Sequence, residues 1–458
     1  MNFDKKHNIY FLGIGGIGMS ALAKYFYSKG KRVAGYDLIS SRITDDMVNE
    51  GINIHYKQDI RYIPQEFLNK EDTIIIRTPA VPDNHKELLY FSENGFLIMK
   101  RAEILGELVN SKRGIAIAGT HGKTSVSSIL AYIMHESELG CSAFLGGILK
   151  NYNSNMIIDE KADWVVAEAD EFDRSFLHLH PEIALITWID ADHLDIYTTK
   201  EEIRKSYEDF VSQVKTGGYV ILKKGIEIDI NKDKVKVFSY SLDDTCADFY
   251  ASNMEIQKGK YFFNIHTPEK LIQGISLTYP GIINIENAVA ATSVAWLTGV
   301  DEQIISTTLS SFKGVTRRFD IQYQSDQIIY IDDYAHHPRE LDAIISSVRK
   351  LYPEKKITGI FQPHLYTRTR DFADEFAMSL NALDELILLE IYPAREKPIK
   401  GIDSKIIYEK VTISSKIICS KSDLMKVLEK RDFEILLTLG AGDIDQFVDP
   451  IRQLIENR

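Results

Sequence analysis

The sequence has few cysteines, no long apolar run and no apolar leader at its start. Its three cysteines, Cys141, Cys246 and Cys419, are widely separated, so they form no metal-spaced pair, and an odd number gives no disulfide framework. No stretch reaches the length that spans a bilayer, and the apolar run that begins at Ile9 is not preceded by a cleavable signal. We therefore expect a cytoplasmic protein with no membrane partner.

Basic residues are outnumbered by acidic ones. The 458 residues include 54 Lys and Arg against 66 Asp and Glu, which gives a formal net charge of −12. Because nucleic-acid-binding surfaces need an excess of lysine and arginine, we expect no nucleic-acid partner. Small anionic ligands stay possible, since a local site can be positive on an acidic protein. The chain is too long for one core, and we expect two to four domains, with three as the working number.

The most informative segment is a glycine loop between a predicted strand at 115–118 and a predicted helix. The loop consists of Gly119, Thr120, His121, Gly122, Lys123 and Thr124. A loop of this kind turns its backbone N–H groups toward one point, where the helix N-terminus adds partial positive charge and the lysine a full one. That point suits a polyphosphate, and the threonine hydroxyl suits a magnesium ion on the same phosphates.

This loop is shorter than the usual phosphate-binding pattern. Two residues, rather than four, separate the first glycine from the Gly-Lys pair, and Ile117 stands where the longer spacing requires glycine. An ordinary strand-to-helix turn with a surface lysine is the alternative. We favour nucleotide binding, because two glycines flank a Gly-Lys-Thr sequence at the right structural junction.

A second glycine turn lies near the start of the chain. Apolar residues predict a strand at 9–12, a helix at 19–28 and a second strand at 32–36. The turn and the end of the second strand contain Gly13, Gly15, Gly16, Gly18 and Asp37. This spacing is typical of a dinucleotide-type fold, and NAD, FAD or a nucleotide-sugar diphosphate would each fit. Tight packing of helix on strand is the purely structural alternative.

Two more loops should face the same site. Thr78 follows a predicted strand at 73–77, and Arg101 follows another at 96–99. In open α/β sheets, ligands lie beyond the carboxyl ends of the strands, so both residues are candidates for substrate binding. Arg101 could meet a phosphate or a carboxylate, or it could be a solvated start to the helix predicted at 102–109.

Clustered acids indicate a cation site. A buried-type strand at 163–167 leads into Glu168, Asp170, Glu171 and Asp173, which repel one another unless a cation lies among them. A strand at 183–187 leads to a further acidic run that contains His193. A carboxylate at the end of a strand beside a phosphate loop is how nucleotide enzymes hold magnesium, so Glu168 and His193 are candidate ligands.

Asn284 and Asn287 share one face of a predicted helix. They could be site residues, or they could only form hydrogen bonds at the start of that helix.

The last part of the chain again alternates strands and helices. Polar clusters then follow each of three predicted strands, at 332–338, 362–370 and 440–443. That placement is what a site at the carboxyl edge of a parallel sheet requires.

With these segments in order, the chain resembles the Mur ligases over nearly its whole length. The segments that carry the resemblance are FLGIGGIGMSALA, AGTHGKT, AEADEFDRSFLHLHP, DADHLDIY, NIENA, RRFD, DDYAHHPRE, QPHLYTRTRD and GAGD. The resemblance implies an α/β protein of three domains: a Rossmann-like UDP-sugar-binding domain at 1–107, a central P-loop ATP-binding domain at 108–313 and a Rossmann-like C-terminal ligase domain at 314–458.

The resemblance also implies roles for single residues. Lys123, Glu168 and His193 would be catalytic, and Thr124, Glu168 and His193 would bind Mg²⁺. Besides the loop from Gly119 to Thr124, the ATP-binding residues would be Asn284, Asn287, Arg318, Asp333 and His336. Substrate binding would fall to Gly13, Gly15, Gly16, Gly18, Asp37, Thr78, Arg101, Arg368 and Arg370. Two departures from the family pattern are Ile283, where histidine is usual, and Leu365, where arginine is common.

The activity implied is ATP-dependent joining of L-alanine to the lactyl carboxylate of UDP-N-acetylmuramic acid, through an acyl phosphate, in peptidoglycan precursor synthesis. A related ligase that attaches murein peptide or another amino acid is the nearest alternative. An NAD-dependent dehydrogenase would leave the Lys123 loop unexplained, and a kinase-like P-loop protein would account for the central domain only. We expect a monomer or a dimer.

Overall fold

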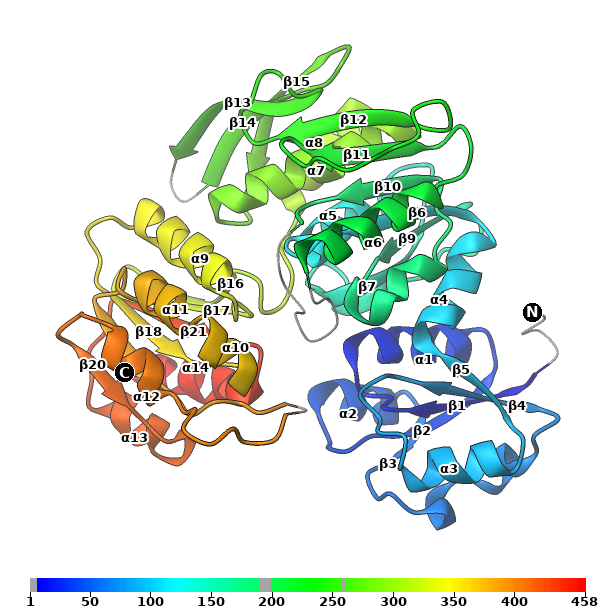
Figure 1. Ribbon diagram of the computed structural model, residues 1–458. Helices are drawn as coiled ribbons and strands as arrows, with labels where there is room; N and C mark the ends of the chain where they lie inside the picture. Colours follow the sequence, from blue (N-terminus) through cyan, green and yellow to red (C-terminus); the bar gives the residue numbers. More distant parts are fainter. Residues whose placement is uncertain (1–5, 190–198, 258–259, 395) are drawn as a thin grey trace. The chain divides into compact units, whose positions relative to one another are not determined.

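The computed structural model describes residues 6–189, 199–257, 260–394 and 396–458 (Figure 1). His193 lies outside these residues. Within them, the strands form three sheets, and the α/β class expected from the sequence is confirmed. The chain divides into two compact units: residues 1–254, 263–276 and 286–312 in the first, and residues 255–262, 277–285 and 313–458 in the second.

The first sheet is parallel and has the strand order β3-β2-β1-β4-β5. Helices α1 and α3 lie on opposite faces of the sheet (Figure 1). Side chains of a strand alternate between faces, so Phe11 belongs to the core cluster that includes Phe26 of α1, while Tyr10 belongs to the one that includes Phe91 of α3. Its elements are β1 (Asn8–Leu12), α1 (Ile17–Ser28), β2 (Arg32–Tyr36), α2 (Arg42–Asn49), β3 (Asn53–His55), β4 (Thr73–Arg77), α3 (Lys86–Glu93), β5 (Leu97–Lys100) and α4 (Arg101–Asn110).

The second sheet has the order β15-β14-β13-β12-β11-β10-β6-β9-β7-β8, with parallel pairing from β13 to β7 and an antiparallel β7–β8 pair. Its strands are β6 (Arg113–Ala118), β7 (Ser142–Leu149), β8 (Ser154–Ile157), β9 (Trp164–Glu168), β10 (Ile183–Ile186), β11 (Tyr219–Lys223), β12 (Lys236–Ser241), β13 (Phe249–Gln257), β14 (Lys260–His266) and β15 (Leu271–Leu277). The helices are α5 (Lys123–His135), the 3₁₀ segment η4 (Phe172–His178), α6 (Lys200–Ser212), α7 (Ile282–Thr298) and α8 (Glu302–Ser311).

The third sheet lies in the second unit and has the order β16-β17-β21-β18-β19-β20, parallel except for the β16–β17 pair. Its core joins Leu436 of β21 to Leu428 of α13 and Ile451 of α14. The elements are β16 (Asp320–Gln324), β17 (Ile329–Asp333), α9 (Pro338–Leu351), β18 (Ile357–Phe361), α10 (Tyr366–Asp371), α11 (Ala373–Leu380), β19 (Glu385–Leu388), α12 (Lys405–Lys410), β20 (Lys416–Ile418), α13 (Leu424–Glu429), β21 (Ile435–Leu439) and α14 (Val448–Glu456).

None of the helices in the described ranges is both long enough and apolar enough to cross a membrane. The three cysteines are free thiols: Cys141 and Cys419 are buried, and Cys246 is exposed.

A network of buried polar side chains lies on the first sheet, on the face that α3 covers. The Tyr10 hydroxyl donates to Oε2 of Glu87 at 2.7 Å and lies 2.7 Å from Nε2 of His55. The Glu87 side chain is fully buried, and burial raises its pKa from 4.5 to about 7 despite the hydrogen bond from Tyr10. Burial lowers the pKa of His55. The Glu87 carboxyl group is therefore protonated in the folded protein below about pH 7, and its ionisation above that pH costs stability.

The raised pKa of Glu87 predicts how the Glu87→Gln substitution changes the free energy of unfolding with pH. The unfolded carboxyl ionises near pH 4.5 and the folded one near pH 7, so the wild type loses stability as the pH rises between these values. The amide keeps an acceptor for Tyr10 and cannot ionise. We expect the variant to be more stable than wild type at pH 8 by about 1–3 kcal/mol, with the difference shrinking toward pH 4.5. Urea unfolding at both pH values measures this, and equal differences at the two pH values would contradict it.

Candidate functional site

The glycine loop lies where the sequence predicts it, between β6 and α5. Gly122, at the N-cap of α5, has a φ of +80°, a left-handed conformation that glycine adopts without strain. The loop is fixed to β10, because the Thr187 N–H donates to the Ala118 carbonyl at 2.9 Å and the Thr120 N–H donates to the Trp188 carbonyl at 3.0 Å. The N-terminus of α5 therefore lies beyond the carboxyl end of β6, the position at which helix N-termini bind anions.

Lys123 is held by the protein itself. Its ammonium donates to the Gly119 carbonyl at 2.6 Å and to Oε2 of Glu171 at 2.7 Å. Its side chain is 12% exposed and that of Glu171 is 3% exposed. Burial on its own lowers the pKa of Lys123, but the carboxylates of Glu171, Asp170 and Glu168 together outweigh burial and raise it. The lysine is therefore a permanent cation with one of its three donors unused by these two bonds.

Thr124 and Glu168 form the oxygen pair expected of a magnesium site. The Thr124 hydroxyl donates to Oε2 of Glu168 at 2.9 Å, and strand pairing places Glu168 beside Ile117 at the end of β6. Gly146 makes room for this carboxylate, since a Cβ there would lie 2.1 Å from the same oxygen. Hydroxyl and carboxylate oxygens are ligands that Mg²⁺ prefers. Among the described residues, no three His, Cys, Asp or Glu side chains gather as a metal-binding group.

Glu168, Asp170, Glu171 and Asp173 are here called the acidic strip. Each carboxylate has its own partner instead of sharing one cation. Glu168 accepts from Thr124 and Glu171 from Lys123, while Asp170 pairs with Arg101 at 3.6 Å and Asp173 with Lys100 at 3.0 Å. The last two partners come from the start of α4 and the end of β5. The strip therefore binds the phosphate loop on one side and the end of the first sheet on the other.

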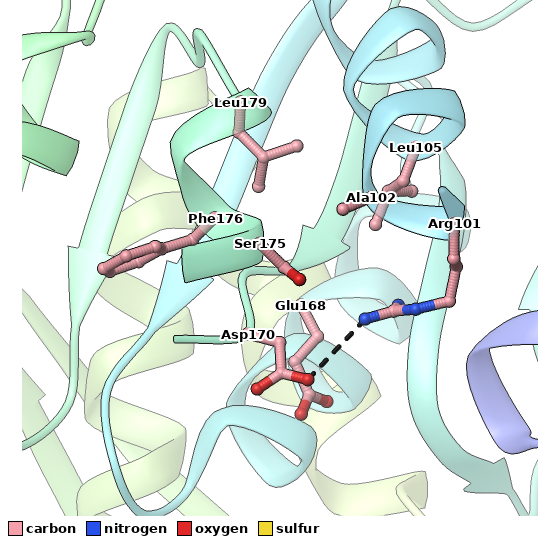
Figure 2. Close-up of a pocket in the computed structure, with 8 residues that line it drawn as sticks. All are labelled: Arg101, Ala102, Leu105, Glu168, Asp170, Ser175, Phe176 and Leu179. Atoms are coloured by element: carbon pink, nitrogen blue, oxygen red, sulfur yellow. Dashed lines mark ion pairs between the residues drawn. The ribbon is translucent and has the colours of Figure 1, made fainter. Parts of the chain in front are cut away.

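A pocket lies between α4 and η4, next to the strip. Figure 2 shows the polar ends of Arg101, Ser175, Asp170 and Glu168 turned toward one another. Apolar side chains line the rest of the pocket, namely Ala102, Leu105, Phe176 and Leu179. The pocket thus offers one cation, two carboxylates and a hydroxyl beside an apolar wall.

The N-terminal glycine turn gathers the other predicted substrate residues. The Gly13 N–H donates to the Tyr36 carbonyl at 2.8 Å, and the Thr78 N–H donates to the Leu12 carbonyl at 3.3 Å. Asp37 accepts the Gly15 N–H at 2.7 Å, so its carboxylate holds the turn itself. Gly16 is the N-cap of α1, and no side chain caps that helix. Gly18 lies against Arg101, whose Nη1 would be 2.8 Å from a Cβ there.

The two asparagines are both buried at the start of α7. The Asn284 amide donates to the Pro280 carbonyl within its own turn. Asn287 reaches the phosphate loop, because its Oδ1 would lie 3.0 Å from a Cβ on Gly122. Of the two, Asn287 is the residue placed beside the loop within the first unit.

The second unit carries a cluster of its own at the end of β17. Asp333 accepts the N–H groups of Phe319 and Ala335, each at 2.7 Å, and burial raises its pKa to about 6. Arg318 pairs with Glu340 at 3.9 Å, and Nδ1 of His336 lies 3.2 Å from the same carboxylate. The predicted residues Arg318, Asp333 and His336 are therefore gathered at one strand end.

The two arginines of α10, the helix that follows β18, differ in exposure. Arg368 is buried, while Arg370 is half exposed and donates to Asp371 at 2.6 Å. Leu365, one of the two departures from the family pattern, is buried with a φ of +71°. Ile283, the other departure, is 39% exposed.

Sequence reasoning did not assign three residues that shape this site. Glu171 holds the loop lysine, Asp170 holds Arg101, and Gly146 leaves room for Glu168. The two acids are visible in the sequence beside Glu168, but nothing local tells which cation each one meets. Gly146 lies on β7 and carries no motif of its own.

Family models match the three parts of the chain in order. The Mur ligase family catalytic domain matches residues 8–113, the Mur ligase middle domain residues 117–295, and the Mur ligase glutamate ligase domain residues 317–442. These matches cover all three sheets and both glycine turns.

Whole-length relatives agree with the family models. The chain is 50% identical to the UDP-N-acetylmuramate–L-alanine ligase of Parabacteroides distasonis over 99% of this chain and 98% of that protein. It is 49% identical to the enzyme of the same name from Porphyromonas gingivalis, over 98% and 99%. In fold it resembles the crystal structure of the UDP-N-acetylmuramate–alanine ligase of Thermotoga maritima, with a TM-score of 0.83, 24% identity and coverage of 98% and 100%. By these matches, made along the chain from residue 8 to residue 442 and beyond, the protein belongs to the Mur ligase family.

Proposed function

We propose that the protein joins L-alanine to the lactyl carboxylate of UDP-N-acetylmuramic acid at the expense of ATP, in peptidoglycan precursor synthesis. The observation that carries the proposal is the grouping of Lys123, Thr124 and Glu168 at the glycine loop. The relatives that share half of the sequence are named for this acid and this amino acid.

The chemistry explains why ATP is needed. A carboxylate is a poor electrophile at neutral pH, and joining it to an amine in water is uphill. In the proposed reaction, a lactyl carboxylate oxygen attacks the γ-phosphorus, the bond to the β-phosphate oxygen breaks, and ADP leaves. The amine of L-alanine then attacks the carbonyl carbon of the acyl phosphate, loses a proton and expels inorganic phosphate. No protein nucleophile takes part.

The phosphate loop supplies the electrostatics of the first step. Lys123 and the N-terminus of α5 would hold the β- and γ-phosphates and offset the charge of two anions that approach each other. Thr124 and Glu168 would hold Mg²⁺, which supplies further positive charge at the phosphates. Glu171 keeps Lys123 in place through a bond that leaves a third ammonium donor for the phosphate.

The remaining predicted residues complete the proposal. Asn287 lies beside the loop and suits the nucleotide, and we assign Asn284, Arg318, Asp333 and His336 to ATP binding as well. We assign the N-terminal turn, with Asp37, Thr78 and Arg101, to the UDP-sugar and assign Arg368 and Arg370 to the substrates. His193 stays a proposed metal ligand. We propose three domains at 1–107, 108–313 and 314–458, in a cytoplasmic monomer or dimer.

The first test removes the loop cation. We expect Lys123→Met to lower kcat at least 100-fold, because the phosphates lose their principal charged donor. Phosphate release in the presence of UDP-N-acetylmuramic acid, L-alanine and ATP measures this. Lys232→Met, at an exposed turn, is the matched control and should retain full activity. Near-normal turnover in the Lys123 variant, with an unchanged circular dichroism spectrum, would refute the assignment.

The second test concerns magnesium. We expect Glu168→Gln to raise the Mg²⁺ concentration for half-maximal rate by about 10-fold or more, since the metal loses a charged ligand. Gly146→Ala should act in the same direction without removing a ligand, because the added Cβ displaces the Glu168 carboxylate. Exposed Glu160→Gln, whose partner is Lys29, is the control. An unchanged Mg²⁺ requirement in both site variants would exclude Glu168 as a ligand.

The third test separates this activity from that of related ligases. We expect phosphate release with UDP-N-acetylmuramic acid to be fastest with L-alanine, compared with L-serine, glycine and a murein tripeptide. An added hydroxyl group or a missing methyl group changes the free energy of transition-state binding in a small pocket by about 1–3 kcal/mol, which is about 10- to 200-fold in kcat/KM. A preference for the tripeptide would instead indicate a peptide-attaching ligase.

A further inference from the structure

The Arg101 guanidinium lies between the two halves of the site. Its Nη1 would be 2.8 Å from a Cβ on Gly18, at the N-terminal turn, and its Nη2 is 3.6 Å from Oδ2 of Asp170, in the acidic strip. Figure 2 shows the guanidinium pointing into the pocket, toward Asp170 and Glu168. The Arg101 side chain is 21% exposed and that of Asp170 37% exposed, so a ligand can reach both groups.

In the proposed reaction, the position of Arg101 would offset the repulsion between the acceptor carboxylate and the acids of the site. The acceptor carboxylate must approach the γ-phosphate in a place where Glu168, Asp170 and Glu171 already stand. Lys123 is engaged by Gly119 and Glu171 and would face the phosphates. Arg101 is the cation that lines the pocket itself. An anion that enters without meeting a cation would be opposed by charge repulsion and by the loss of its hydration.

The present partner of Arg101 indicates the kind of ligand that the guanidinium would bind. At 3.6 Å the contact with Asp170 is an ion pair longer than a normal hydrogen bond, so the planar fork of the arginine still has its donors to offer. Asp170 is a carboxylate, and it stands where a substrate carboxylate would enter.

We infer that Arg101 determines specificity by binding the lactyl carboxylate of the UDP-sugar, which takes the place of Asp170 on the guanidinium. The inference deepens the proposed function and rests on it. We assign the diphosphate to the N-terminus of α1, where Gly16 is the N-cap and no side chain makes a capping hydrogen bond, so backbone N–H groups can donate to phosphate oxygens. Arg101 would thus distinguish a sugar that carries the acid from one that lacks it.

The experiment compares three ligands on four proteins by titration calorimetry. The ligands are UDP, UDP-N-acetylglucosamine, which lacks the lactyl group, and UDP-N-acetylmuramic acid. The proteins are wild type, Arg101→Gln, Arg101→Lys and the control Arg113→Gln, at the opposite end of β6. We expect Arg101→Gln to weaken binding of UDP-N-acetylmuramic acid by roughly 10- to 100-fold and to leave the other two ligands within about twofold of wild type. We expect the affinity of Arg101→Lys for UDP-N-acetylmuramic acid to lie between those of wild type and Arg101→Gln.

Asp170→Asn gives a test in the other direction. It removes the competing carboxylate, so we expect UDP-N-acetylmuramic acid to bind several-fold more tightly while UDP-N-acetylglucosamine is unchanged. Equal losses for all three ligands in Arg101→Gln would assign the arginine to the diphosphate and overturn the inference, as would no loss at all. Turnover of UDP-N-acetylmuramic acid by wild type tests the proposed function separately, so the two ideas can fail independently.

Discussion

Four carboxylates within six residues are the constraint on which this site depends. Unpaired, the carboxylates of Glu168, Asp170, Glu171 and Asp173 would repel one another and push the segment apart. The chain resolves the repulsion by giving each acid a separate partner, and three of these partners are the groups that the proposed chemistry needs. The positions of Lys123, Thr124 and Arg101 are therefore consequences of one charge-pairing problem.

The same pairing connects the two glycine turns of the first unit. Lys123 and Thr124 belong to the phosphate loop, and Arg101 lies against Gly18 of the N-terminal turn. Both turns end buried parallel strands, whose carboxyl edges bring backbone donors and helix N-termini together. A continuous apolar core that includes Phe11, Ile104 and Val165 lies beneath them. The core fixes the backbone, and the acidic strip fixes the charged ends.

Local sequence was enough to predict the elements but not the pairs between them. Apolar runs and glycines predict β6, β9 and the loop before α5, because these signals act within a few residues. The partner of Lys123 lies 48 residues away, and sequence alone does not show which acid of the strip it meets. The strip also turns through Asp173 and Arg174, both with a φ of +53°, a conformation that neither residue type predicts. The strands at one end of the second sheet, from β13 to β15, carry no motif and were not predicted.

In the proposed function, the acidic strip would weaken the binding of anions that arrive without a metal. The Lys123 ammonium and the Arg101 guanidinium each already pair with a carboxylate. An incoming anion therefore binds only if its interaction with these cations is stronger than the ion pairs that it replaces. A triphosphate that arrives without its metal meets Glu168, Asp170 and Glu171 at close range, and repulsion offsets the attraction of the loop. A triphosphate that brings Mg²⁺ would carry a positive charge for Glu168 to coordinate, so one repulsive contact would become attractive. Under the proposed function, the strip would therefore make nucleotide binding depend on the metal, while the backbone donors of the loop would provide affinity for phosphate in general.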